Sequence, residues 1–149
     1  MNQDERTDRE AIRVVMAQYN IDGDRGRVGS LAALFLPDGK LHFSGSFSTG
    51  PAEIEARLST KNSNPALTVS RHHLTTSLIE LDGAQANGRS YFQVLTDIGL
   101  DHHGVYVDLL EKQGGGWWFK DRQVRIDWQS PQSLFSGLHV RGRKPDASE

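Results

Sequence analysis

TVSRHHLTTSLIEL, residues 68–81, opens the half of the chain that decides the fold. Three stretches of the same kind follow it: ANGRSYFQVLTDI (86–98), VYVDLLEK (105–112) and WWFKDRQVRIDW (117–128). β-Branched and aromatic residues are frequent in these stretches, which is typical of strands. Asp82-Gly83 and the run Gly114 to Gly116 supply hairpin turns between them. The second half of the chain therefore predicts a series of long antiparallel strands.

The first half of the chain has helical spacing instead. Thr7 and Glu10 form a capping box, and apolar residues follow at positions i, i+3, i+4 and i+7, namely Ile12, Val15, Met16 and Tyr19. A second apolar stripe runs from Val28 to Phe35 and is ended by Pro37. The pattern predicts two N-terminal helices that form a hairpin.

A short strand and a third helix are predicted next. Leu41, Phe43 and Phe47 alternate as in a strand, and Pro51 stands at a favourable first position for a helix. The segment KNSNPA (61–66) has the composition of a turn. Helices followed by a run of antiparallel strands predict an α+β fold, with the sheet curled around the helices.

The length fits one domain, which we expect over residues 1–130. After Trp128 the sequence becomes polar and contains proline and glycine, so residues 131–149 are expected to form a C-terminal tail. Such a tail is either mobile or exchanged with a neighbouring chain.

Charge and cysteine content exclude several function classes. The formal net charge is −2, which gives no general attraction to nucleic acid or anionic membranes. The chain has no cysteine, so disulfides, thiolate metal sites and thiol nucleophiles are excluded. The first residues, MNQDERTDRE, lack the apolar run of a signal peptide, and no stretch is apolar enough for a membrane span. We expect a cytoplasmic protein whose partners are small molecules or proteins.

Three phrases, in order, resemble the SnoaL-like branch of the nuclear transport factor 2-like superfamily. They are YNIDGDRGRVGSLAALFLPDG (19–39), HLTTSLIELDGAQANGRSYF (73–92) and GGWWFKDRQVRIDW (115–128). The resemblance covers roughly residues 8 to 128. It implies a cone-shaped α+β barrel in which the N-terminal helices pack inside a curved, mostly antiparallel sheet.

Scytalone dehydratase, hexachlorocyclohexane dehydrochlorinase and bile acid 7α-dehydratase are the enzyme types of this superfamily to which the chain is similar. All three eliminate a small leaving group. The resemblance implies a catalytic aspartate after the first helix, matched by Asp24, that faces a histidine on a strand, matched by His73. A neutral imidazole accepts a proton near pH 7, and a carboxylate on its other nitrogen stabilises the imidazolium that forms.

Further site residues follow from the same resemblance. Tyr19 matches a pocket tyrosine, and Arg122 matches an arginine that steadies the leaving group, so we count Arg122 as catalytic. Arg125 is its rival, because a single bulge exchanges the faces of the two arginines. Other residues are expected to bind the substrate: Phe43, Tyr106 and Trp128.

The chain also departs from the pattern of scytalone dehydratase. The position of that enzyme's second pocket histidine falls near Ile98, and its serine and asparagine pair becomes Gly104 and Tyr106. We therefore expect the acid partner of that mechanism to be missing.

Several residues have a structural interpretation as well. Asp24 has the features of a helix cap or turn residue, and His73 has a neighbour, His72, that points to the opposite side of a regular strand. The pairs His72-His73 and His102-His103 diverge for the same reason, so no metal site is predicted.

The sequence thus predicts a lyase of the dehydratase type or an isomerase that needs no cofactor. Its substrate is expected to be a small, mostly apolar ring compound such as a polyketide, a steroid or an intermediate of aromatic degradation. The alternative is a non-catalytic ligand-binding module or the structural small subunit of a ring-hydroxylating dioxygenase. We also expect a homo-oligomer, either a trimer or a dimer.

Overall fold

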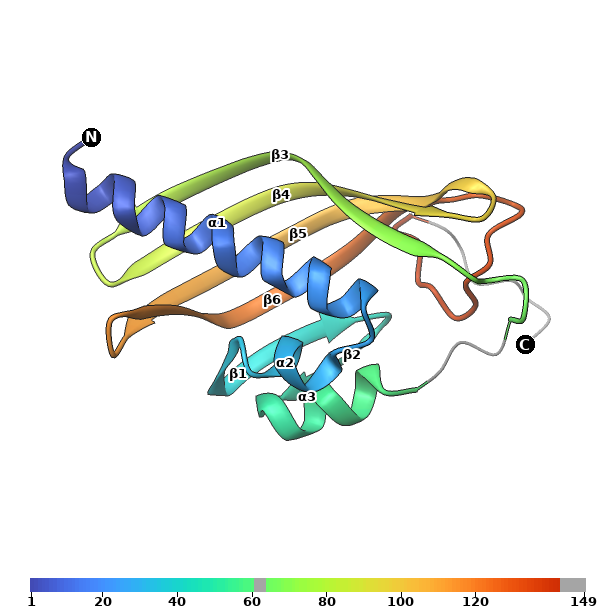
Figure 1. Ribbon diagram of the computed structural model, residues 1–149, viewed down its shortest axis with the longest axis horizontal. Helices are drawn as coiled ribbons and strands as arrows, with labels where there is room; N and C mark the ends of the chain where they lie inside the picture. Colours follow the sequence, from blue (N-terminus) through green and yellow to red (C-terminus); the bar gives the residue numbers. More distant parts are fainter. Residues whose placement is uncertain (61–63, 143–149) are drawn as a thin grey trace.

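Helix α1 (Gln3–Asp24) runs along the concave side of a curved sheet in the computed structural model, which describes residues 1–60 and 64–142 (Figure 1). Its capping box consists of Asn2 and Glu5, each side chain bonded to the backbone nitrogen of the other residue, at 2.8 and 2.9 Å. The predicted box at Thr7 is therefore wrong. The earlier box satisfies the free N–H groups one turn sooner, so the helix is longer.

The second helix is shorter than its apolar stripe predicted. α2 spans Val28–Ala32, and Phe35 already belongs to strand β1 (Phe35–Phe43). Pro37 and Gly39 lie within this strand, where its register against the neighbouring strand is irregular. A Cβ on Gly39 would lie 2.7 Å from the carbonyl oxygen of Phe119, so the two backbones approach as closely as glycine permits.

The predicted strand through Leu41 and Phe47 is divided by a turn. Ser44 and Gly45 both have positive φ, and β2 (Ser46–Thr49) returns antiparallel to β1. Helix α3 (Gly50–Leu58) follows, and Pro51 is its second residue, one position later than predicted. The predicted turn at 61–66 lies partly outside the described residues, since 61–63 are not included.

The four long strands of the second half are present: β3 (Ser70–Asp82), β4 (Gln85–Thr96), β5 (Gly99–Gln113) and β6 (Gly116–Gln129). β5 begins at Gly99, before the predicted start at Val105. The sheet has the order β2-β1-β6-β5-β4-β3, and its neighbours are antiparallel except for β1 and β6. The predicted α+β fold is confirmed. The sheet is curved but open, with β2 and β3 at its edges.

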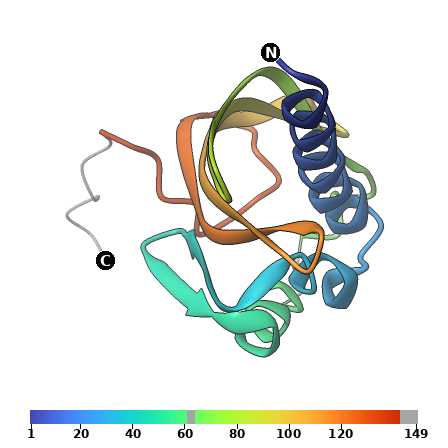
Figure 2. The same ribbon diagram turned by 90° about the vertical axis from the view of Figure 1, so that its left-hand side faces the viewer.

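Helices close the concave side of this sheet. α1 packs on β3 and β6, and α3 packs on α2, β1 and β2. Figure 2 shows the sheet curving round so that α1 lies along its open side. β4 alternates strictly between exposed and buried residues, which separates an outer face from an inner, core-facing one. The core therefore lies between α1 and the inner face.

The segment that the sequence assigned to a tail returns to the sheet of its own chain as far as residue 142. Val140 forms a parallel bridge with Ile126, and the Arg141 backbone nitrogen donates to the Ile126 carbonyl at 2.7 Å. Residues 143–149 lie outside the described part. No helix in the described ranges is long and apolar enough to cross a membrane.

Candidate active site

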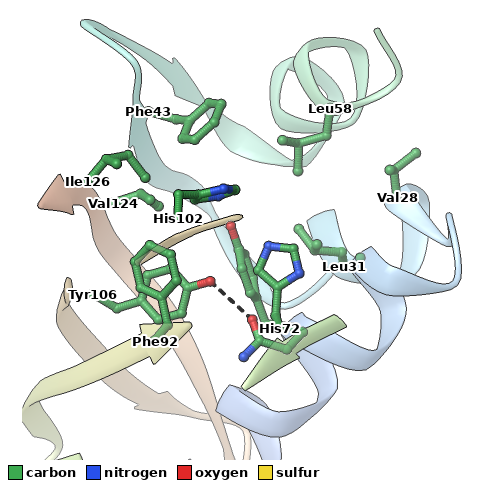
Figure 3. A pocket seen from close by; sticks show the side chains of 13 residues that line it. Val28, Leu31, Phe43, Leu58, His72, Phe92, His102, Tyr106, Val124 and Ile126 are labelled. Atoms are coloured by element: carbon green, nitrogen blue, oxygen red, sulfur yellow. Dashed lines mark hydrogen bonds between the residues drawn. The ribbon is translucent and has the colours of Figure 1, made fainter. Parts of the chain in front are cut away.

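A cavity of about 180 Å³ lies between the three helices and the inner face of the sheet (Figure 3). Most of its wall is apolar: Val28, Leu31, Phe43, Leu58, Phe92, Val124 and Ile126. Its polar side chains are Tyr19, Asn20, His72, His102 and Tyr106. An engineered cavity of roughly 150 Å³ holds benzene. The volume therefore suits a single ring with a few polar substituents.

One imidazole of the cavity is paired with a buried carboxylate. His72 on β3 lies with its Nδ1 2.6 Å from Oδ1 of Asp24, the last residue of α1. The His72 backbone nitrogen donates to the other carboxylate oxygen at 3.0 Å. An ionised carboxylate only accepts, so the proton of the neutral imidazole lies on Nδ1. Nε2 then carries the free lone pair.

The predicted histidine, His73, is wrong as the partner of Asp24. It is exposed and lies opposite Gln93 on the outer face. Leu74 pairs with Phe92 and Thr76 with Tyr91, so Thr75 is an extra residue in β3. On a regular strand, His73 would share the face of the buried Ile79. The extra residue shifts the alternation by one position, so His72 shares that face instead. His72 faces inward for this reason.

A second imidazole with a carboxylate partner lies in the same cavity. His102 Nδ1 is 2.7 Å from Oδ1 of Asp101, its neighbour in the chain. Val94 pairs with His102 and Leu95 with Leu100, so Asp101 is the extra residue of another bulge. Both residues are buried, at 0% and 4% exposure. The bulge places two consecutive side chains on one side of the sheet.

Burial and hydrogen bonding act against each other at this second pair. Burial lowers the pKa of His102 below its ordinary value and outweighs the carboxylate, which raises it. At Asp101, burial acts to raise the pKa, but hydrogen bonds from Ser133, His102 and the Leu134 backbone together hold it below the ordinary value. The pair therefore consists of a carboxylate and a neutral imidazole near pH 7.

His102 also corrects the expectation that a second pocket histidine is missing. Figure 3 shows both imidazole rings facing the same space, beside Tyr106 and Phe43. The sequence signal was the Asp101-His102 dipeptide next to a glycine turn. On a regular strand these two side chains diverge, so the pairing depends on a bulge that the residue pattern does not reveal.

The predicted binding residues Tyr19, Phe43 and Tyr106 line the cavity. The Tyr106 hydroxyl donates to Oδ1 of Asn20 at 3.1 Å, and its ring stacks on Phe92 with 4.3 Å between centroids. Burial raises the pKa of both tyrosines, so their hydroxyls stay protonated. The cavity thus combines hydroxyl and amide groups with the two imidazoles.

Arg122 does not line the cavity, contrary to its predicted role. It is fully buried and forms two hydrogen bonds with the Asp108 carboxylate, at 2.8 and 2.9 Å. Its guanidinium lies 4.2 Å from the ring of Tyr19 and 3.9 Å from that of Tyr106. Burial acts to lower its pKa, but the Asp108 carboxylate and the two tyrosines together outweigh burial and raise it. Arg122 therefore supports the tyrosines from behind.

Arg125 and Trp128 are not among the cavity-lining residues either. Arg125 alternates with Val124 and Ile126, which line the cavity, and bonds Gln123 at 3.0 Å. Trp128 follows a bulge at Asp127 and stacks on His103, with ring centroids 5.7 Å apart. Both predicted substrate contacts are wrong for this cavity, because alternation and the bulge place these side chains on the outer face.

No group of three or more histidine or acidic side chains in the described part of the chain is arranged to hold a metal ion. Each cavity imidazole has its Nδ1 bonded to a carboxylate. Histidines that transfer protons and histidines that bind metals both have this arrangement. The predicted absence of a metal and of a cofactor stays a prediction.

Comparisons with known proteins agree with this fold. The model of the SnoaL-like domain matches residues 4–123. A Mycobacterium tuberculosis protein of unknown function is 27% identical over 83% of this chain and 74% of its own, with a TM-score of 0.73. A scytalone dehydratase-like protein of Novosphingobium aromaticivorans is 22% identical over 97% of this chain and 100% of its own, with a TM-score of 0.78.

A hexachlorocyclohexane dehydrochlorinase of Novosphingobium barchaimii has a similar structure. It is 21% identical over 92% of this chain and 96% of its own, and the TM-score is 0.74. Among curated proteins, none matches the chain.

Proposed function

This chain belongs to the SnoaL-like domain family, and on that premise we propose that it is a cofactor-independent lyase or isomerase acting on a small ring compound. One observation carries the proposal: the 2.6 Å contact between Asp24 and the imidazole of His72 at the wall of an apolar cavity. A dehydrochlorinase and a scytalone dehydratase-like protein have structures similar to that of this chain, and this similarity supports proton abstraction as the proposed chemistry.

His72 is the general base in this proposal. Its Nε2 removes a proton from a carbon of the substrate, and Asp24 stabilises the imidazolium that forms. In an elimination, the electrons of the broken C–H bond form a C=C bond as the bond to a hydroxyl breaks. The imidazolium then returns the proton to that hydroxyl, which leaves as water. In an isomerisation, the proton returns to another carbon of the same substrate.

His102 holds the substrate in this scheme. Its Nδ1 proton is engaged by Asp101, so its Nε2 accepts a hydrogen bond from a substrate hydroxyl. Tyr19, Asn20 and Tyr106 supply the other polar contacts. Arg122 has no contact with the substrate and acts only through the tyrosine rings it supports. In this scheme the leaving group is contacted by residues that line the cavity and not by Arg122.

Shape and polarity favour a single-ring, mostly apolar substrate. The cavity of about 180 Å³ is walled by aliphatic and aromatic side chains, with its polar groups gathered at the imidazoles and tyrosines. A hydroxylated or halogenated ring with a carbonyl group fits this arrangement, because the carbonyl activates the neighbouring C–H bond. The predicted cytoplasmic location stays a prediction.

The test follows deuterium uptake and elimination in a panel of cyclic ketones and hydroxyketones incubated with the protein in D₂O. The wild type is expected to exchange or eliminate at least one compound faster than buffer alone. His72→Gln should lower that rate by roughly 10²- to 10⁴-fold, the usual contribution of a general base. His73→Gln is the matched control on the same strand and should retain the rate.

Two results would contradict the proposal. If compounds bind in the cavity but none exchanges or eliminates, the chain is a ligand-binding module. If His73→Gln loses the rate while His72→Gln keeps it, the assignment of the base is wrong.

A further inference from the structure

The segment after β6 contacts the second carboxylate–imidazole pair directly. The Ser133 hydroxyl donates to Asp101 Oδ1 at 2.6 Å, and the Leu134 backbone nitrogen donates to Oδ2 at 2.8 Å. The Ser130 backbone nitrogen donates to the Asp101 carbonyl at 2.8 Å. These residues lie beyond position 123, where the match to the family model ends. Nothing in that match gives them a role.

The hydrogen-bond pattern around Ser133 fixes the direction of its hydroxyl. Its oxygen accepts from Gln129 Nε2 and from the Phe135 backbone nitrogen, each at 3.1 Å. A hydroxyl has one proton and two acceptor positions, so both acceptor positions are in use. The proton is therefore directed to Asp101, the remaining partner.

Asp101 receives four hydrogen bonds as a result. Oδ1 accepts from His102 and Ser133, and Oδ2 accepts from Leu134 and from the Thr96 hydroxyl at 3.2 Å. A protonated carboxyl would lose one of these acceptor sites inside the protein. The pattern therefore keeps Asp101 ionised, and the proton of the neutral His102 on Nδ1.

The ring of His102 is held from the same segment. Phe135 meets it edge to face, with centroids 5.0 Å apart, and Phe92 meets it at 6.5 Å from within the sheet. The imidazole is thus fixed by one carboxylate contact and two aromatic rings. Two of these three contacts depend on residues 133–135, directly or through Asp101.

We propose that Ser133 is a positioning residue for His102, and that residues 133–135 belong to the active site. Ser133 acts through Asp101: it shares the negative charge of the carboxylate and so sets how strongly Asp101 holds the Nδ1 proton of His102. This role rests on the proposed function in one respect: it takes His102 to be a group that binds the substrate. The hydrogen-bond arrangement itself is independent of any substrate.

The electrostatic consequence has a definite sign. The titratable groups that act on His102 are Asp101, His72 and His103. Removing the Ser133 hydroxyl leaves more negative charge on Asp101, which favours the imidazolium form of His102. The pKa of His102 is then expected to rise.

The test is a histidine titration of the full chain by NMR in wild type, Ser133→Ala, Ser133→Thr and Ser130→Ala. Ser130 is a matched control, because its hydroxyl bonds Gln132 and not the carboxylate. We expect the His102 pKa to rise by roughly 0.5 or more in Ser133→Ala. Ser133→Thr, which keeps the hydroxyl, and Ser130→Ala should titrate like the wild type.

A His102 titration in Ser133→Ala that matches the wild type would overturn the proposal. If Ser133→Ala fails to fold, the wild type alone decides: its ¹⁵N spectrum must show neutral His102 with the proton on Nδ1, and a proton on Nε2 overturns the proposal. Neither measurement needs a substrate. A failure to find deuterium exchange therefore concerns the proposed function, and an unchanged titration concerns Ser133.

Discussion

His72 and His102 are prepared for proton transfer in the same way, although they reach the cavity from different strands. Each has its Nδ1 beside a carboxylate oxygen, at 2.6 and 2.7 Å, and each lines the cavity. They differ in burial: the His72 side chain is 27% exposed and the His102 side chain 5%. Burial disfavours the charged form of an imidazole, so the more exposed side chain is the better candidate for the base. That side chain is His72.

At the residue scale, His102 makes stability depend on pH. Its pKa is below the ordinary value, so the unfolded chain takes up this proton first as the pH falls. The neutral His102 therefore contributes fully to the free energy of unfolding above about pH 6.5, and this contribution is lost as the pH decreases below that value. We expect His102→Asn, which keeps a donor for Asp101, to show a weaker decrease than wild type.

Urea denaturation at pH 5.5, 6.5 and 7.5 measures this difference. The free energy of unfolding of wild type should fall relative to the variant by at most about 1.4 kcal/mol per pH unit. Parallel pH profiles for the two proteins would show that His102 is protonated equally in the folded and unfolded states.

Also at the residue scale, the ion pair of Arg122 and Asp108 is fully buried, at 0% side-chain exposure for both partners. Arg122→Met leaves the carboxylate without its counter-charge, so we expect a loss of about 3–5 kcal/mol in the free energy of unfolding. The double variant Arg122→Met with Asp108→Leu removes both charges and should recover most of this loss.

Lys112→Met is a control for the ion pair. Lys112 bonds Asp8 at 2.8 Å but is 41% exposed, so the substitution should cost less than about 1 kcal/mol. Urea denaturation measures all the variants. If the double variant is as unstable as Arg122→Met, the loss comes from packing and not from the uncompensated charge.

At the element scale, irregular strand pairing determines which side chains reach the cavity. The bulge at Thr75 turns His72 inward, and the one at Asp101 brings this residue beside His102. Asp24, Tyr19, Phe43 and the strand segments could be read from the sequence, since spacing and family resemblance give their positions. His72 could not be identified in this way, because one extra residue in a strand exchanges the faces of all the residues that precede it.

Arg122 could not be assigned from the sequence for a different reason. The residue pattern does not decide whether Arg122 or Arg125 faces inward, and it says nothing about which residue the inward-facing arginine meets. The buried carboxylate of Asp108 lies on the neighbouring strand and captures the guanidinium. Such a pairing depends on the register of β5 against β6, which is shifted at two bulges.

A third bulge gives a prediction at the element scale. Gly104 lies where β5 approaches β6, and a Cβ at this position would overlap the backbone carbonyl of Arg125. Gly104→Ala should therefore push the strands apart and cost about 3 kcal/mol or more, at the upper end for single substitutions. Gly83→Ala is the control: it has a positive φ but open space around it, so about 1 kcal/mol is expected.

Thermal and urea denaturation of the two glycine variants provide the measurement. A Gly104→Ala protein no less stable than Gly83→Ala would mean that β5 and β6 are not in close contact at this point. The register that aligns His103 with Trp128 would then be wrong as well.

At the scale of the whole molecule, the outer face of the sheet has several exposed apolar side chains. Tyr91 is 49% exposed, Leu78 61% and Trp128 40%. Self-association stays a prediction, and this face is where we expect the contact, since exposed apolar patches commonly mark interfaces. Light scattering after size exclusion should give a mass above 16.6 kDa for wild type and a smaller one for Tyr91→Glu. A monomeric wild type would contradict self-association.

The whole molecule brings both imidazoles to one cavity, and a crystal structure soaked with a panel of small ring compounds tests that most directly. The predicted result is a ring bound between His72 and His102, with a polar atom of the ligand about 3 Å from an Nε2 atom. Asp24 and Asp101 should keep their contacts with Nδ1. Ligand bound only on the outer face, or Asp24 turned away from His72, would contradict the proposed proton-transfer site.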